Sequence, residues 1–105
     1  DIARFSGWTA DFRRFELTGP DGRTVSLSGG EAGVLRVLLE SANRLLTRAE
    51  LLDRLGLSAD RNFDRSIDVR VSRLRSKLEE DPRNPRLIKT VYGAGYLMVA
   101  PVKWS

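Results

Sequence analysis

The chain has 105 residues, of which 41% are apolar and 30% are charged, a composition typical of one globular domain. It contains no cysteine and no histidine, so it has no disulfide, no thiolate ligand, no imidazole base and no imidazole metal ligand. Most classes of hydrolase and metalloenzyme are excluded on these grounds. We therefore expect a protein that is not an enzyme, with no catalytic residues and no cofactor or metal site.

The positive charge of the chain is concentrated in its carboxy-terminal part. The net charge is +4 and the isoelectric point is near 10.1. Residues 1–60 carry 8 Lys and Arg against 9 Asp and Glu, whereas residues 61–105 carry 10 against 5, so the two parts have net charges of −1 and +5. Clustered Lys and Arg are typical of proteins that bind the phosphates of a polyanion. A basic surface without a partner is the alternative.

The sequence shows no sign of a membrane-spanning segment. No apolar run approaches the roughly 18 residues that a membrane span needs, and residues 1–6 lack the charged and apolar regions of a signal peptide. We expect a cytoplasmic domain that makes no contact with a membrane. Because the sequence begins with Asp1 rather than with methionine, we also expect it to be a piece of a larger protein.

The first 28 residues favour a small sheet. Short β-prone stretches alternate with turn residues, and Gly19-Pro20-Asp21-Gly22 separates Phe15–Leu17 from Thr24–Leu27. Proline and glycine supply the backbone angles that a tight turn needs, so this spacing predicts a hairpin. We predict a four-stranded antiparallel sheet over residues 1–28.

Two short helices are predicted next, each by a capping box. In Ser28-Gly29-Gly30-Glu31 the serine caps a helical amide and the glutamate caps the serine in return. Thr47-Arg48-Ala49-Glu50 repeats the pattern after a short link, and Gly56 marks the end of the second helix. Their apolar residues recur at the spacing of one buried helical face: Val34, Leu35, Leu38 and Leu39 in the first helix, and Leu51, Leu52 and Leu55 in the second.

The third and longest helix is predicted from roughly Phe63 to Glu80, with Asp81-Pro82 ending it. One narrow apolar stripe runs along it and is assigned to the core: Ile67, Val71, Leu74 and Leu78. Residues 29–81 are thus predicted to form a three-helix core.

The opposite side of the third helix is basic and small-polar. On its face and flanks lie Arg65, Ser66, Asp68, Val69, Arg70, Ser72, Arg73, Arg75, Ser76 and Lys77. In the major groove of DNA an arginine donates two hydrogen bonds to guanine, a serine bonds a phosphate or a base, and a valine contacts a thymine methyl group. A solvated surface is the alternative for any single arginine, but it explains the whole group less well. The acidic end, residues 79–81, is expected to face away from DNA.

A second hairpin is predicted at the carboxy terminus. Residues 85–91 and 96–99 are β-prone and are joined by Tyr92-Gly93-Ala94-Gly95, whose two glycines allow positive φ angles in the turn. A tight pair of helices, a basic helix and a Gly-containing hairpin over residues 86–100 follow the order of a winged helix-turn-helix. We therefore predict an α+β fold made of the amino-terminal sheet, three helices and this wing.

Two segments resemble the OmpR/PhoB-type effector domains of bacterial two-component response regulators. They are residues 62–78, NFDRSIDVRVSRLRSKL, and residues 88–96, IKTVYGAGY. The resemblance covers essentially all of residues 1–105, because the amino-terminal sheet and the Leu27–Glu31 start of the first helix agree in order. It implies a transcription factor that binds direct repeats in promoters, often as a head-to-tail pair, with its third helix in the major groove of double-stranded DNA.

The resemblance also implies roles for individual residues. Those expected to contact bases are Ser66, Val69, Arg70, Ser72 and Arg73. Those expected to contact the DNA backbone are Arg61, Arg65, Arg75, Ser76 and Lys77, together with Lys89 and Thr90 of the wing. Tyr92 stands where the family usually has an arginine near the minor groove. It is therefore expected to pack on a sugar, to donate to a phosphate, or to pack inside the wing.

Several partners are implied by the same resemblance: promoter DNA, RNA polymerase through Gly56–Asn62, an amino-terminal receiver domain and a cognate histidine kinase.

Two alternatives stay open, namely a winged-helix module that binds an acidic protein surface and a cytoplasmic DNA-binding domain of a membrane-tethered regulator. A DNA-binding protein loses affinity with added salt at a slope near the number of phosphates it neutralises, and it prefers duplex DNA to an acidic peptide. An enzyme is not favoured, because the sequence has no Gly-x-Ser-x-Gly or P-loop motif, and Gly93-Ala94-Gly95 lacks the third glycine and the following helix of a nucleotide fingerprint.

Overall fold

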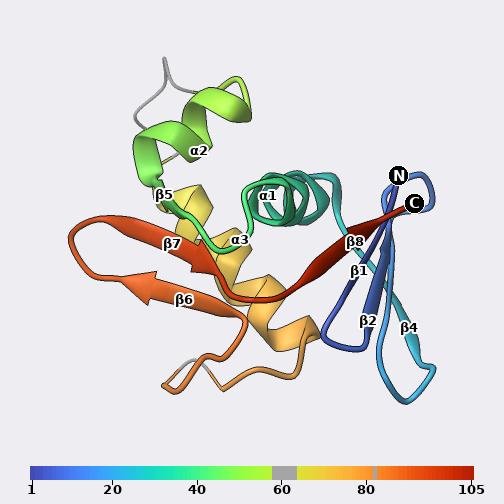
Figure 1. Ribbon diagram of the computed structural model, residues 1–105. Coiled ribbons are helices and arrows are strands. Elements are labelled where there is room, and N and C mark those ends of the chain that lie inside the picture. The colour runs from blue at the N-terminus through green and yellow to red at the C-terminus, as the bar shows by residue number, and fades with distance from the viewer. Residues whose placement is uncertain (58–63, 82) are drawn as a thin grey trace.

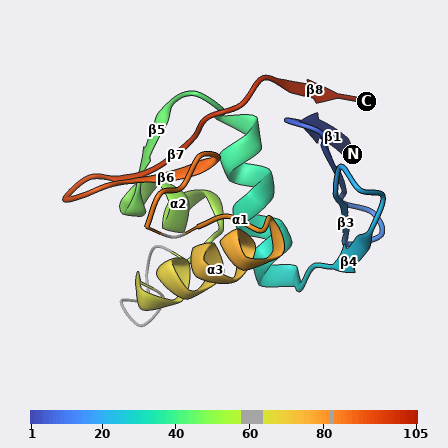
Figure 2. The same ribbon diagram turned by 90° about the horizontal axis from the view of Figure 1, so that it is seen from below.

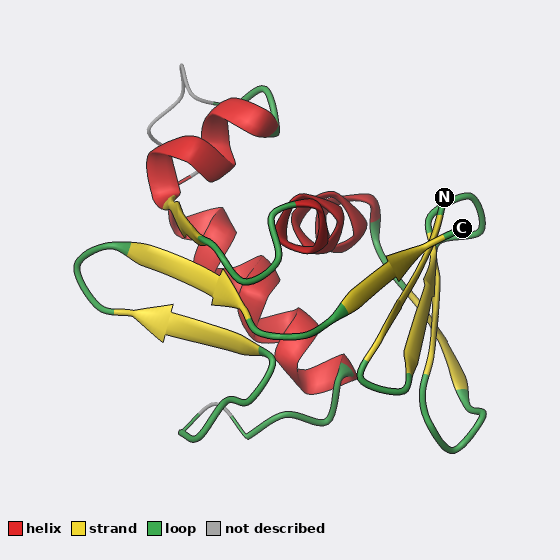
Figure 3. Ribbon diagram, viewed as in Figure 1, coloured by secondary structure: helices red, strands yellow, loops and turns green. Residues whose placement is uncertain are grey.

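The computed structural model describes residues 1–57, 64–81 and 83–105. It has the predicted α+β fold, in which α1 lies between a five-stranded and a three-stranded sheet (Figure 1). Figure 3 distinguishes the helices from the strands by colour. In chain order the elements are β1 Ile2–Phe5, β2 Trp8–Asp11, β3 Glu16–Thr18, β4 Thr24–Ser26, α1 Gly29–Glu40, β5 Leu45–Thr47, α2 Arg48–Arg54, α3 Asp64–Lys77, β6 Ile88–Val91, β7 Gly95–Met98 and β8 Val102–Trp104.

The predicted amino-terminal sheet is present and gains a strand from the other end of the chain. Strands β1 to β4 pair antiparallel in sequence order and β8 pairs with β1, so the sheet order is β4-β3-β2-β1-β8. The predicted turn joins β3 to β4 with Gly22 at a φ of +85°. Ala3, Ala10 and Leu17 lie in register across three strands and are fully buried in the core. The fifth strand was not predicted, because its three residues are too few for a pattern.

Both capping boxes form as predicted and determine where α1 and α2 begin. The Ser28 hydroxyl accepts a hydrogen bond from the Glu31 amide at 3.1 Å, and the Glu31 carboxylate accepts one from the Ser28 amide at 2.7 Å. Thr47 and Glu50 make the same pair of bonds at 3.0 and 3.2 Å. The predicted apolar faces point inward: Val34, Leu35, Leu38, Leu39, Leu51 and Leu52 are buried, and Leu55 is half-buried.

The short link between α1 and α2 is a strand rather than a loop. β5 pairs antiparallel with β7, which pairs with β6, so a three-stranded sheet connects the helix pair to the wing. Of the two glycines in the wing turn, Gly93 alone has a positive φ, +77°. A β-carbon at Gly95 would lie 2.0 Å from the Leu46 carbonyl oxygen. Glycine is therefore required at position 95 by the close approach of β5, and not by its φ angle.

α3 carries the predicted core stripe but is shorter than predicted. The stripe residues Ile67, Val71, Leu74 and Leu78 are buried. The helix ends at Lys77, and the backbone turns away at Glu79, whose φ is +56°. The predicted start at Phe63 lies outside the described residues. The first wing strand is also shorter than predicted, because the loop before β6 follows side-chain hydrogen bonds instead of a strand ladder. The second has the predicted length and begins one residue earlier than predicted, at Gly95.

α3 lies at the border of the molecule. Figure 2, seen from below, shows it along one side, with α1 and the two sheets beyond it. α1 packs against both α2 and α3. The side of α3 that faces away from α1 is thus left open.

Candidate nucleic-acid interface

The open side of α3 presents four of the predicted contact residues together. Val69, Ser72, Arg73 and Ser76 are exposed, and their spacing of three and four residues places them on one helical face. We call these four residues the outer face of α3. Val69 is 46% exposed near its middle, and Ser66, one turn earlier, is half-buried.

Two arginines of α3 carry charge that the rest of the described chain does not neutralise. Within residues 1–57, 64–81 and 83–105, the side chains of Arg70 and Arg73 make no ion pair and no hydrogen bond. Lys89 on β6 is also unpaired in this part of the chain. An unpaired surface cation keeps its charge for a partner such as a phosphate. Other unpaired cations lie outside α3 and the wing: Arg14, Arg83, Arg86 and Lys103.

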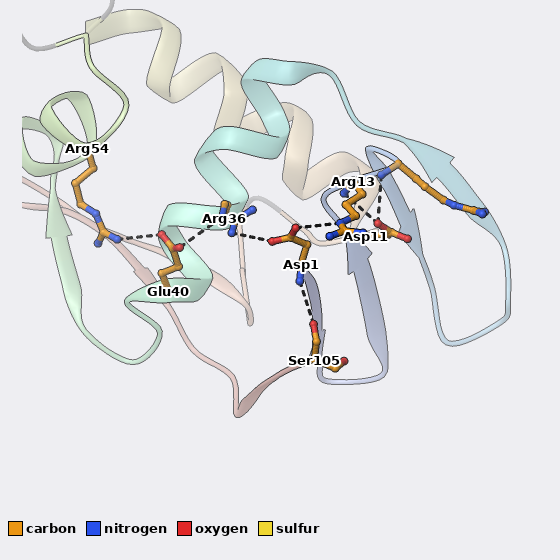
Figure 4. A network of polar contacts seen from close by, with 8 residues as sticks. Asp1, Asp11, Arg13, Arg36, Glu40, Arg54 and Ser105 are labelled. Atoms are coloured by element: carbon orange, nitrogen blue, oxygen red, sulfur yellow. Dashed lines mark hydrogen bonds and ion pairs between the residues drawn. The ribbon is translucent and has the colours of Figure 1, made fainter.

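Three arginines around α1 are paired instead. Figure 4 shows a chain of alternating charges that runs from Arg54 through Glu40, Arg36 and Asp1 to Arg13, with N–O distances of 3.1, 3.4, 3.1 and 3.3 Å. Each arginine there already has a carboxylate partner. The unpaired positive charge of the helical core is thus on α3.

Arg70 lies over the first turn of α1 and not in line with Val69 and Arg73. Its side chain is half-buried, and a β-carbon at Gly30 would lie 2.8 Å from its Nε. Glycine at position 30 leaves the space that the guanidinium fills. The start of a helix attracts anions through its free amides and its dipole. Arg70 therefore places a cation beside a second group that favours negative charge.

Arg75 was predicted to contact phosphate, but the structure turns it inward. It is 9% exposed. Its Nε and Nη2 donate to the Ile88 carbonyl oxygen at 3.0 and 2.5 Å, and Nη2 also donates to the Thr90 hydroxyl at 2.8 Å. The prediction is corrected because a buried cation needs such acceptors and is held by them. Thr90, also expected at the DNA backbone, is half-buried and occupied by this bond.

Lys77 is likewise held within the domain and not free for a phosphate as predicted. Its Nζ donates to the Ser26 carbonyl oxygen at 2.7 Å and to the Glu31 carboxylate at 2.6 Å. Glu31 is 3% exposed, and burial by itself would raise the pKa of its carboxyl group. The hydrogen bonds from Lys77 and Ser28 outweigh burial and hold that pKa below its ordinary value.

The wing presents two exposed polar side chains. Lys89 is exposed on β6, and Tyr92 is 93% exposed at the tip. The Ala94 amide closes the turn by donating to the Val91 carbonyl oxygen at 3.0 Å. Tyr92 is therefore not packed inside the wing, and its side chain is left free to pack on a sugar or to donate to a phosphate.

The family model described as "Transcriptional regulatory protein, C terminal" matches residues 22–98. The chain belongs to this family, the OmpR/PhoB-type effector domains. Among its relatives, Regulatory protein VirG of Agrobacterium fabrum is 44% identical over 101 residues, which are 96% of this chain and 40% of VirG. Transcriptional regulatory protein AruR of Pseudomonas aeruginosa is 39% identical over 99 residues, which are 94% of this chain and 41% of AruR. The effector domain thus spans about 40% of the length of these curated relatives.

A solved relative shares the fold of the effector domain. The DNA-binding domain of Klebsiella pneumoniae RstA, in complex with the RstA box, matches with a TM-score of 0.82 and 33% identity over 94% of this chain and 97% of the RstA chain. The predicted winged-helix fold is confirmed. The chain is a DNA-binding domain of a transcriptional response regulator, and the protein-interaction alternative is not favoured. This family is not an enzyme class.

Some predicted contacts of the effector domain lie outside the described residues. These are Arg61, the side chain of Arg65, and residues 58–62 of the loop expected to touch RNA polymerase. In the described part of the domain, no group of acidic residues is placed to hold a metal ion. No helix in that part is both long and apolar enough to cross a membrane.

Three residues that the sequence left without a role lie between α3 and the wing of the effector domain. The Asp68 carboxylate accepts hydrogen bonds from the Tyr96 hydroxyl and, at 2.7 Å, from Arg48 Nη2. Burial and the bond to Asp68 raise the pKa of Tyr96 to about 12. Glu80 accepts bonds from the amides of residues 86–88. No sequence spacing points to these pairs, because the partners meet only when the hairpin folds back onto α3.

Proposed function

We propose that the outer face of α3 reads base pairs in the major groove of promoter DNA. The observation that carries the proposal is the exposed Val69 beside the unpaired Arg73. An arginine in this position donates to O6 and N7 of a guanine, and a valine covers a thymine methyl group. Ser66 and Ser72 lie next to this pair and are the further base contacts.

We assign Arg70 to the DNA backbone and not to a base. Arg70 lies over the first turn of α1, beside the outer face of α3. In this position a phosphate at the rim of the major groove contacts both the guanidinium of Arg70 and the start of α1. Ser76, Lys89 and Tyr92 supply further backbone contacts from α3 and the wing. Arg61 and Arg65 keep their expected phosphate contacts. Arg75, Lys77 and Thr90 hold the protein together in this proposal and do not touch DNA.

For the whole regulator we propose a receiver domain on the amino-terminal side, a cognate histidine kinase and a cytoplasmic location. The resemblance to response regulators and the greater length of VirG and AruR support this organisation. Two effector domains then bind direct repeats head to tail, with half-sites spaced about 10 to 11 base pairs.

Residues Gly56–Asn62 contact RNA polymerase in this proposal. Asp60→Ala should therefore lower transcriptional activation and leave the affinity for DNA unchanged.

The base-reading proposal is tested by selecting duplexes from a randomised pool and titrating the winner by fluorescence anisotropy at two salt concentrations. We expect a repeated motif, which Arg73→Ala binds more weakly by about 1 to 3 kcal/mol with relaxed preference at one base position. Arg36→Ala is the matched control, because Arg36 is paired with Asp1 and Glu40, and it should bind as the wild type does. Preference for single-stranded RNA, or for an acidic peptide over every duplex, would refute the proposal.

A further inference from the structure

Ile88, the first residue of the wing, is held on both sides of its backbone by the end of α3. Its carbonyl oxygen accepts the two bonds from Arg75, and its amide donates to the Glu80 carboxylate at 3.0 Å. Glu80 also accepts bonds from the amides of Arg86, at 2.7 Å, and Leu87. The two holding residues are joined to each other, since the Glu80 amide donates to the Arg75 carbonyl oxygen at 2.8 Å. Arg75 near the end of α3 and Glu80 just after the helix thus anchor the start of β6.

The second wing strand is held by the same helix. The Tyr96 hydroxyl donates to Asp68, which lies two turns before Arg75 on α3. The guanidinium carbons of Arg75 and Arg48 lie 5.8 and 5.5 Å from the centre of the Tyr96 ring. Tyr96 pairs with Thr90 across the hairpin, and Thr90 accepts a bond from Arg75. Both strands are therefore tied to one side of α3.

Two exposed side chains of the wing are not tied in this way. Among the described residues, Tyr92 and Lys89 have no side-chain partner. A two-stranded hairpin is marginally stable by itself, so its direction depends on what holds its base. Asp68 comes directly before Val69, and Arg75 comes two residues after Arg73. The residues that hold the wing and the residues of the outer face are therefore on the same rigid helix.

We infer that Asp68, Arg75, Glu80 and Tyr96 form a clasp that sets the wing at a fixed position relative to the outer face of α3. α3 and the wing then meet DNA as one unit, and the clasp residues are positioning residues that touch no DNA. The inference rests on the proposed contacts of α3 and the wing with DNA. Its consequence is that Lys89 and Tyr92 contribute to affinity only while the clasp is closed.

A double-mutant cycle on the affinity of the whole chain for the selected duplex tests the clasp. One change combines Lys89→Ala on β6 with Tyr92→Ala at the tip, which we call the wing-tip pair. The other is Arg75→Lys, which keeps the charge but loses the planar fork that spans Ile88 and Thr90. In the wild-type background, we expect the wing-tip pair to weaken the affinity for the duplex about 3- to 10-fold. In the Arg75→Lys background, the same pair should weaken this affinity less than about 2-fold. The salt dependence of binding should fall in Arg75→Lys by about one phosphate.

Two further variants keep the test decisive. Tyr96→Phe removes only the hydroxyl bond to Asp68, so it opens the clasp even where Arg75→Lys fails to fold. Leu17→Val loosens the distant five-stranded sheet, and in this control the wing-tip pair should weaken binding as much as in the wild type. The clasp proposal would be overturned if the wing-tip pair weakened duplex affinity by the same factor in every background, or if it had no effect on the affinity of the wild type. A wild type that binds no duplex would instead overturn the proposed function itself.

Discussion

The outer face of α3 and the side of the same helix that faces the wing contain similar residues in opposite surroundings. Arg73 is exposed and has no partner among the described residues. Arg75, two residues later, is 9% exposed and donates three hydrogen bonds to the wing. A step of two residues turns a helix by about 200°, so neighbouring arginines point to solvent and to protein.

This contrast shows that the number of cations on a helix does not tell how many bind a ligand. A buried guanidinium stays charged only where acceptors surround it, as the Ile88 carbonyl and the Thr90 hydroxyl surround Arg75. An exposed guanidinium without acceptors remains available to a phosphate or a base. One side of α3 therefore builds the domain and the other meets its partner, and mutations on the two sides should separate stability from binding.

The largest effect is expected on stability. Arg75→Ala removes the charged donor from the Ile88 carbonyl and should lower the free energy of unfolding by about 2 to 4 kcal/mol. Arg73→Ala should change it by less than about 0.5 kcal/mol, because it removes an exposed side chain with no described partner. Urea denaturation followed by circular dichroism measures both values. Similar losses for the two variants would contradict the division of α3 into two sides.

The next effect divides the outer arginines by what they contact. Arg73→Ala should lose affinity by about 1 to 3 kcal/mol for the selected duplex only, whereas Arg70→Ala should weaken all duplexes alike and reduce the salt slope by about one. Anisotropy titrations with the selected and a scrambled duplex give both quantities. A change of base preference in Arg70→Ala would return this residue to the base-contacting set.

A smaller effect concerns the pH dependence of stability on the inner side. The pKa of Glu31 in the folded domain is lowered, so its stabilising contribution is complete above the unfolded value near 4.3 and is lost as the pH falls through the folded value. Glu31→Gln should therefore cost about 1 kcal/mol at neutral pH and flatten the loss of stability as the pH falls below the unfolded pKa of the carboxyl group. Urea midpoints at several pH values measure this. Adding Lys77→Met to Glu31→Gln should leave the slope of unfolding free energy against pH unchanged. A change in this slope would show that Lys77 acts through a group other than Glu31.

The smallest effect is expected at the wing tip. Tyr92→Ala should leave the free energy of unfolding within about 0.5 kcal/mol of the wild type, because its side chain is 93% exposed. Tyr92→Arg adds a cation and should steepen the salt dependence of duplex binding by about one phosphate. Titration at three salt concentrations tests this, and an unchanged slope would mean that the tip does not reach the DNA backbone.

Features that depend on neighbours along the chain could be predicted from the amino-acid sequence. The capping boxes at Ser28 and Thr47, the apolar stripe of α3 and the positive φ at Gly93 were predicted from residues at most a few positions apart, and the structure confirms them. Helix caps, helical faces and turns are local in this sense. The family motifs lie within such segments, so the amino-acid sequence alone was enough to indicate the family.

Which polar side chains bond within the domain depends on contacts between segments that are far apart in the sequence. Arg75 donates to the Ile88 carbonyl oxygen, which is 13 residues away in the sequence, and Lys77 donates to Glu31, which is 46 residues away. Gly95 is required because β5 approaches it from a segment far back in the chain, and β8 forms only because β1 is there to pair with it. The physical reason is that a hydrogen bond or a close contact depends on distance in space, and a helical periodicity places a side chain on a face without saying what covers that face.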